Sequence, residues 1–332
     1  MAGVDIAQGL DRGEDVRKLR LHAVDLLVAE VQPREARDVE DVVPADGGHG
    51  PMVACGPMPV TAIPIRDGTI EAYPLGGGDG IPLVVLGGVE TGFRPLGGTE
   101  SVLDRRWSER GERRSVTVLG RPIPDDPADA ELVMHPRVMA DGVAAALATL
   151  GLGPVAIEAE SGGGRISLWL TVDHPELVDR LVLAAVASET PADSPMRTRM
   201  GRWVELAEAG EWATFFASMA QLMKAGNETE SEAFATASRL QPRPATPERF
   251  IGELKATLDP TSFVTDRLGE IDVPALVLAG ELDQVVPVEI TRLVADRIPG
   301  AHLITDPECG HTVRSSFRGY DELVESFLAE GD

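Results

Sequence analysis

Cysteine is nearly absent from this chain, since Cys55 and Cys309 are the only two among 332 residues. Two cysteines cannot form the disulfide network that stabilises small secreted proteins. Metal-binding patterns such as Cys-x-x-Cys and His-Glu-x-x-His are absent as well. We therefore expect two free thiols, no metal ion and no cofactor.

Positive charge and long apolar runs are also scarce. The chain has 30 Lys and Arg against 54 Asp and Glu, a net charge of −24, which repels nucleic acids and anionic membrane surfaces. No apolar run approaches the ~18 residues of a membrane-spanning helix. The start, Met1-Ala-Gly-Val-Asp5, lacks the basic and apolar segments of a secretory signal. We expect a soluble cytoplasmic protein that binds neither nucleic acid nor membrane.

The composition is otherwise that of a globular protein, with 43% hydrophobic and 25% charged residues. Residues 1–56 are the least regular part. One amphipathic helix is expected before Pro33, followed by a stretch rich in acidic residues, Gly and Pro. We expect an N-terminal arm that is partly mobile, and the alternative is an arm through which two chains form a homodimer.

Short apolar runs alternate with helical patterns over residues 57–188 and again over 261–332. A hairpin is expected around Arg66-Asp67-Gly68, and a loop over residues 76–80. The alternation predicts an α/β fold, a mostly parallel sheet flanked by helices. The expected strands are 60–65, 69–73, 83–86, 115–119, 155–157, 181–185, 275–278 and 302–305.

The segment 189–260 interrupts this alternation. It contains no convincing strand and is expected to form about four helices, inserted into the α/β core as a helical cap. Methionine adapts to irregular shapes, so a segment rich in Met and Phe suits the wall of an apolar pocket. The plainer alternative is that these residues only pack a core. The residues expected to contact a substrate are Gly88, Trp203, Phe215, Phe216 and Met219.

One serine lies in a sequence typical of a sharp strand-to-helix turn. Ser161 follows the apolar run 155–157 and precedes three glycines, with small residues two positions away on either side, Ala159 and Gly163. This small-x-Ser-x-Gly pattern is that of a nucleophile elbow, which exposes a serine hydroxyl at the carboxyl edge of a sheet. A glycine-rich turn with an incidental serine is the alternative.

A serine nucleophile needs a base, and the base needs a carboxylate. His311 follows the last expected strand, and Asp283 follows the strand before it, so both are expected at the carboxyl edge of the sheet. Glu189 is the alternative carboxylate. For the oxyanion of an acyl-transfer intermediate, the expected donors are the backbone N–H groups of Gly162 and Val89.

Taken together, residues from about 58 to 330 resemble the α/β-hydrolase fold superfamily of the serine hydrolase type. The resemblance rests on Gly87-Gly88 after a strand, the Ser161 elbow, the order Ser, Asp, His, and three motifs: residues 175–183, 273–280 and 310–311. Glu158 and Glu160 beside the elbow depart from the common pattern. We expect both carboxylates to lie away from the pocket, and the alternative is that one of them tunes His311 or binds a cationic substrate.

The resemblance implies a serine hydrolase, and we expect it to hydrolyse a carboxylic ester or lactone, with a small molecule of hydrophobic acyl or lactone type as the substrate. The alternatives on the same residues are cleavage of a carbon–carbon bond and acyl transfer or cyclisation. An epoxide hydrolase or haloalkane dehalogenase would have Asp at position 161 and is not expected. A ligand-binding protein without turnover is the alternative from another class, although it would have no need of the three polar residues.

Overall fold

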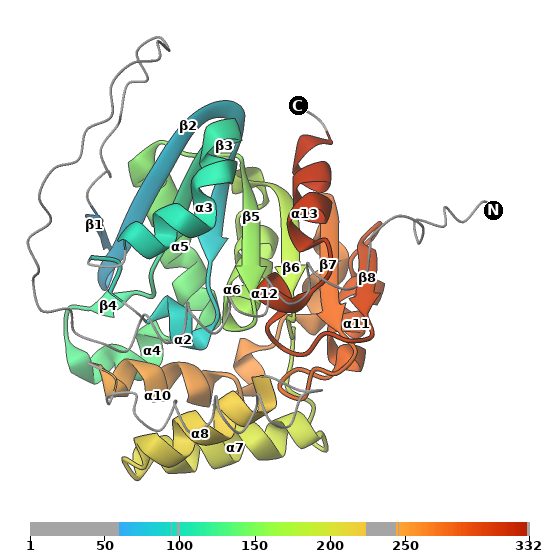
Figure 1. The fold of residues 1–332 in the computed structure, drawn as a ribbon. Coiled ribbons are helices and arrows are strands. Elements are labelled where there is room, and N and C mark those ends of the chain that lie inside the picture. Colours follow the sequence, from blue (N-terminus) through green and yellow to red (C-terminus); the bar gives the residue numbers. More distant parts are fainter. Residues whose placement is uncertain (1–59, 94, 98–99, 224–243, 245, 331–332) are drawn as a thin grey trace, which may run out of the picture. The chain divides into compact units, whose positions relative to one another are not determined.

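The computed structural model describes residues 60–93, 95–97, 100–223, 244 and 246–330 (Figure 1). The N-terminal arm expected over residues 1–56, with its alternative role in dimerisation, lies outside the described residues. So do residues 224–243 of the expected cap.

The core is an eight-stranded sheet that is mostly parallel, as the alternation of strands and helices predicts. Its main path runs β1-β2-β5-β6-β7-β8, and β3 and β4 both pair with β2. The strands are β1 (Thr61–Ile65), β2 (Gly68–Leu86), β3 (Arg114–Leu119), β4 (Ile123–Pro124), β5 (Val155–Glu160), β6 (Val178–Ala184), β7 (Ala275–Gly280) and β8 (His302–Asp306).

Strand β2 is longer than the sequence predicts. The hairpin with β1 is present, but the glycine-rich residues 76–80, expected as a loop, lie inside one bent strand. Both halves of β2 pair with β3, so that Leu75 and Leu83 are each opposite Val116. The bend needs glycine because Gly76 has φ +75° and a Cβ there would overlap the backbone of Gly111.

Helices cover both faces of the sheet, and neighbouring residues of one strand separate the two cores. Val84 of β2 packs in the core that contains Met139 and Ile166, whereas Val85 packs in the core that contains Trp107 and Phe327. The helices outside the segment between β6 and β7 are α2 (Val89–Gly92), α3 (Glu100–Arg113), α4 (Ala130–Val133), α5 (Pro136–Leu150), α6 (Gly162–Asp173), α11 (Val288–Arg297), α12 (Val313–Ser316) and α13 (Tyr320–Ala329). Short 3-10 turns span Pro127–Asp129, Pro175–Leu177, Pro260–Ser262 and Thr265–Glu270.

The described part of the segment between β6 and β7 contains three helices and no strand. They are α7 (Pro195–Glu208), α8 (Trp212–Met223) and α10 (Pro247–Ala256), and they share a third apolar core. Figure 1 shows α7 and α8 below the sheet, with α10 between them and the rest of the fold. We refer to these three helices as the helical segment.

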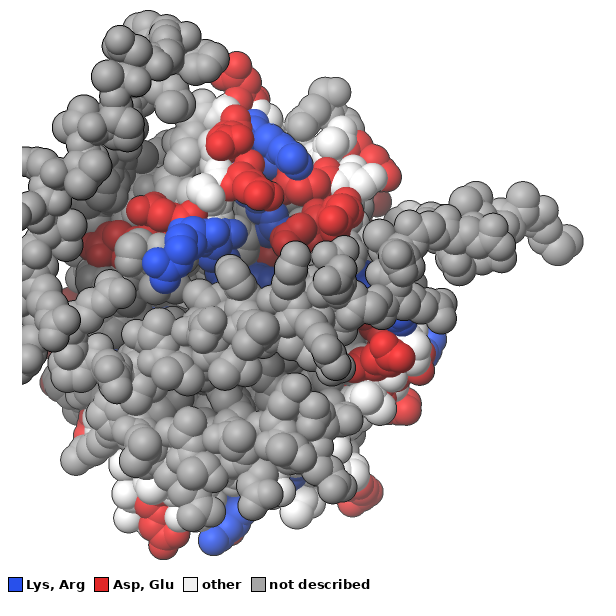
Figure 2. All heavy atoms as spheres, in the orientation of Figure 1, with Lys and Arg blue, Asp and Glu red and all other residues white. Residues whose placement is uncertain are grey.

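No described helix is long and apolar enough to cross a membrane. Acidic and basic side chains are intermingled on the face drawn in Figure 2, where the described residues form no continuous basic patch.

The backbone of α6 approaches that of β2 closely at Gly163. A methyl group there would overlap the carbonyl oxygen of Leu86 and lie 2.7 Å from that of Gly87. We predict that Gly163→Ala lowers the free energy of unfolding by about 1–3 kcal/mol, because backbone atoms cannot move aside as a side chain can. Denaturant titration measures this change.

Gly201 in α7 is the matched control, since a Cβ there meets nothing within 4 Å. We expect Gly201→Ala to raise the free energy of unfolding by roughly 0.5–1 kcal/mol, the helix preference of Ala over Gly. Equal effects of the two substitutions would contradict the steric account.

Candidate active site

Ser161 lies between the end of β5 and the start of α6, in a backbone conformation that is rare for a residue with a side chain. Its φ and ψ are 51° and −118°. The Ser161 N–H donates to the carbonyl oxygen of Ala184 in β6 at 2.9 Å, which holds the turn against the sheet. Strain of this kind persists only where the surroundings enforce it, and it is common at active sites.

His311 and Asp283 lie in two loops that are held together at the same edge of the sheet. The Leu282 N–H donates to the carbonyl oxygen of Cys309 at 2.9 Å, and a Cβ at Gly280 would overlap that same oxygen. The loop after β7 and the loop after β8 therefore bring Asp283 and His311 together.

Hydrogen bonds join these two residues to Ser161 in a chain. Nδ1 of His311 is 2.8 Å from Oδ2 of Asp283, and Nε2 is 2.9 Å from Oγ of Ser161. Oδ1 of Asp283 accepts from the N–H groups of Val285 and Val286 at 2.8 and 2.9 Å, which fixes the carboxylate plane. With its proton on Nδ1, His311 donates to Asp283 and leaves Nε2 free to accept the serine proton.

The surroundings of His311 favour its protonated form. Burial lowers the pKa of His311, but the charge of Asp283, their hydrogen bond and the charge of Glu160 together raise it above its ordinary value. The charge of Glu189, the alternative carboxylate, acts instead on Arg165, where it raises the pKa of the guanidinium against the larger effect of burial.

The two segments expected to donate to an oxyanion meet beside Ser161. A Cβ at Gly88 would lie 3.4 Å from Cβ of Ser161, and a Cβ at Gly162 would lie 2.8 Å from Cγ2 of Val89. Gly88, Val89 and Gly162 all line the cavity that Ser161 faces. These three residues therefore lie beside Ser161 in the wall of the same cavity.

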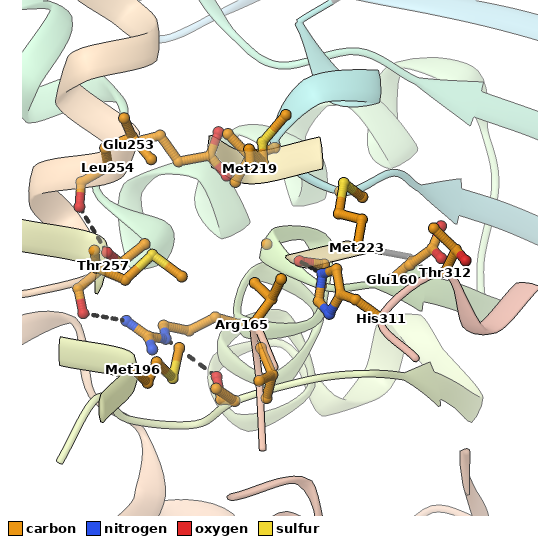
Figure 3. A pocket seen from close by; sticks show the side chains of 18 of the residues that line it. Glu160, Arg165, Met196, Met219, Met223, Glu253, Leu254, Thr257, His311 and Thr312 are labelled. Carbon is orange, nitrogen blue, oxygen red and sulfur yellow. Dashed lines mark hydrogen bonds between the residues drawn. The ribbon is translucent and has the colours of Figure 1, made fainter. Parts of the chain in front are cut away.

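A cavity of about 200 Å³ lies between the elbow and the helical segment, and its lining is mostly apolar. Trp203 and Met219, two of the residues predicted to contact a substrate, line it together with Met196, Met200 and Met223. Figure 3 shows Met219 and Met223 on the side of the cavity opposite Arg165.

Phe215 and Phe216, also expected to contact a substrate, are not among the residues lining this cavity. Both are buried in an aromatic cluster in which each ring packs against Trp212 and Phe250. Met219 lies one turn further along α8, and only that part of the helix reaches the cavity. The helical spacing of these residues does not distinguish the two environments.

The two carboxylates beside the elbow both contact Arg314, but only one of them lines the cavity, so the expectation that both avoid the pocket is wrong for Glu160. Glu158 is fully buried and accepts from Arg110, Arg314 and Tyr320. Glu160 lines the cavity, 3.7 Å from Arg314. Residues two positions apart in a strand face the same side, which agrees with the shared contact to Arg314, and Glu160, the last residue of β5, also reaches the cavity.

Arg165 is a cavity residue that the sequence did not reveal. It lies one helical turn after Ser161 and is buried, donating to the carbonyl oxygen of Thr257 (Figure 3). It also donates to the carbonyl oxygen of Ala187 and to the hydroxyls of Ser262 and Thr190. Burial lowers its pKa to about 10. The sequence feature that could have identified Arg165 is its position four residues after Ser161, about one turn into the helix that follows the elbow.

A buried ion pair between Arg121 and Glu253 was also not predicted, and Glu253 lines the cavity. The two residues are 132 positions apart, and no sequence pattern links them.

The family model of the alpha/beta hydrolase fold matches residues 121–313. A 2-hydroxymuconate semialdehyde hydrolase of Pseudomonas putida is 29% identical over 264 residues, 77% of this chain and 89% of the relative. The pimeloyl-[acyl-carrier protein] methyl ester esterase of Nitrosomonas europaea is 26% identical over 50% of this chain and 67% of its own length.

Among solved structures, the enzyme MGS-M2 from a Medee basin deep-sea metagenome library has a TM-score of 0.63 at 17% identity, covering 81% of this chain and 97% of that one. At this identity the likeness concerns the fold. The family model matches more than half of the chain, and the sheet order and elbow agree with it. This chain therefore belongs to the alpha/beta hydrolase fold family and is a hydrolase.

Proposed function

We propose that the chain hydrolyses a carboxylic ester or lactone by nucleophilic catalysis, with Ser161 as nucleophile, His311 as base and Asp283 as the carboxylate that orients it. The observation that carries the proposal is the hydrogen-bonded chain from Ser161 through His311 to Asp283, placed at the wall of a mostly apolar cavity.

In this mechanism Oγ of Ser161 attacks the substrate carbonyl while Nε2 of His311 accepts the serine proton. Asp283 stabilises the imidazolium that forms. The N–H groups of Val89 and Gly162 stabilise the oxyanion of the tetrahedral intermediate. His311 then gives the proton to the leaving alcohol, and water, activated by the same imidazole, releases the acid from Ser161.

The lining of the cavity favours a small substrate with a hydrophobic acyl group. Four methionines and Trp203 supply much of its apolar wall, and methionine adapts to irregular shapes. The relative named pimeloyl-[acyl-carrier protein] methyl ester esterase supports an ester as the bond that is cleaved.

Carbon–carbon bond hydrolysis is the second candidate. Two relatives named 2-hydroxymuconate semialdehyde hydrolase, which are carbon–carbon hydrolases, match 77% of this chain. Kinetic comparison separates the two candidates. A higher kcat/KM for 2-hydroxymuconate semialdehyde than for every member of a panel of esters and lactones would replace the ester proposal with this one.

The role of Ser161 is tested with Ser161→Ala. We expect a fluorophosphonate probe to label the wild type and not the variant, and the kcat for aryl esters to fall at least about 10³-fold. Ser315, which also lines the cavity, provides the control. Ser315→Ala should still be labelled, and labelling of Ser161→Ala as fast as the wild type would refute the mechanism.

The pH dependence tests the effect of Glu160 on His311. The base must be neutral, so activity should rise with pH through the pKa of His311. Because the charge of Glu160 raises that pKa, we predict that Glu160→Gln moves the acid limb of kcat/KM to lower pH. Glu281, an exposed carboxylate that does not line the cavity, provides the control variant Glu281→Gln. A shift to higher pH in Glu160→Gln would contradict this electrostatic account.

A further inference from the structure

The ion pair between Arg121 and Glu253 is almost fully buried, each residue being 2% exposed. Nε of Arg121 donates to Oε2 of Glu253 at 2.8 Å, and Nη2 donates to Oε1 at 2.9 Å. Arg121 follows β3, whereas Glu253 belongs to α10 of the helical segment. The pair therefore joins two parts of the fold with the planar, two-bond geometry that fixes orientation best.

The pair touches both segments that carry the proposed oxyanion donors. Nη2 of Arg121 also donates to the carbonyl oxygen of Gly87 at 3.0 Å, one residue before the Gly88-Val89 turn. On the other side, a Cβ at Gly162 would lie 2.8 Å from Oε1 of Glu253 and 3.3 Å from Nη2 of Arg121.

The backbone of Arg121 is itself held in place. Its N–H donates to the carbonyl oxygen of Gly92 at 2.8 Å, and its carbonyl oxygen accepts from Nη2 of Arg249 at 2.8 Å. Gly92 ends the short helix α2 that begins at Val89, so Arg121 contacts the loop both before and after Val89. A movement of Arg121 would therefore move this loop.

Stability alone is a poor explanation for such a pair. Replacing a buried ion pair by apolar residues of similar size is often neutral or stabilising, whereas removing one partner strands a buried charge. The pair lies beside the proposed oxyanion donors, where small displacements of an N–H group slow the reaction. Limiting such displacements is therefore a better explanation for the pair than stability.

We propose that the Arg121–Glu253 pair is a positioning device for the oxyanion site: it holds the Gly87–Val89 loop against Gly162, so that both N–H donors stay directed at the substrate carbonyl oxygen. This role rests on the proposed function, since it needs the nucleophile at Ser161. The pair makes no bond to the reacting atoms and acts through the loop.

The test measures the rate of fluorophosphonate labelling, which requires no knowledge of the natural substrate. The variants are Arg121→Met, Glu253→Leu and the double variant with both changes. We expect the maximal labelling rate to fall about 10- to 100-fold in all three, with little change in the probe concentration at half-maximal rate. In the double variant the midpoint of the acid limb should stay where it is, because both charges of a neutral pair are removed together and His311 is untouched.

The double variant separates positioning from stability. Its melting temperature should recover relative to the single variants, because no charge is left unpaired, while its labelling stays slow. Glu325→Gln is the matched control, since Glu325 pairs with the buried Arg110 and Arg114 and is not among the residues that line the cavity. This control should be labelled at the wild-type rate.

Two results would be decisive against the proposal, and they are distinguishable. If the double variant is labelled as fast as the wild type, the pair has only a structural role and the positioning proposal fails alone. If the wild type shows no labelling that depends on Ser161, the proposed function fails and the positioning role fails with it.

Discussion

The close contact between α6 and β2 at Gly163 is the constraint on which the arrangement of the site depends. Only a residue without Cβ lets the start of α6 approach the carbonyl oxygens of Leu86 and Gly87. That approach places Ser161, in its strained conformation, next to the loop that follows β2. The remaining parts of the site are then supplied by the loops after β7 and β8, which end at the same edge of the parallel sheet.

Two deeply buried carboxylates near the elbow, Glu158 and Glu253, have arginine partners. Glu158 pairs with Arg110 and Arg314, and Glu253, which lines the cavity, pairs with Arg121. A buried carboxylate without such partners would cost several kcal/mol. Glu160 is less buried and lines the cavity, and its charge contributes to raising the pKa of His311.

The fold and the three residues proposed as a triad follow from local patterns, because strand ends, a glycine-rich turn and the order of Ser161, Asp283 and His311 are all visible in the sequence. Side-chain direction is not visible in this way. Helical spacing made Phe216 and Met219 look equivalent, although only the methionine lines the cavity. Pairs such as Arg121 with Glu253 join distant parts of the chain, and the catalytic roles, the cap boundaries, the cytoplasmic location and the ester or lactone substrate stay predictions.

The central claim is that hydrolysis passes through a covalent intermediate on Ser161. Peptide mapping by mass spectrometry, after a reaction with a slowly deacylated aryl ester is quenched in acid, tests this claim most directly. The account predicts an acyl group on the peptide that contains Ser161, present during turnover and lost once the ester is exhausted. An acyl group on another residue, or turnover with no acylated peptide and no loss of rate in Ser161→Ala, would contradict it.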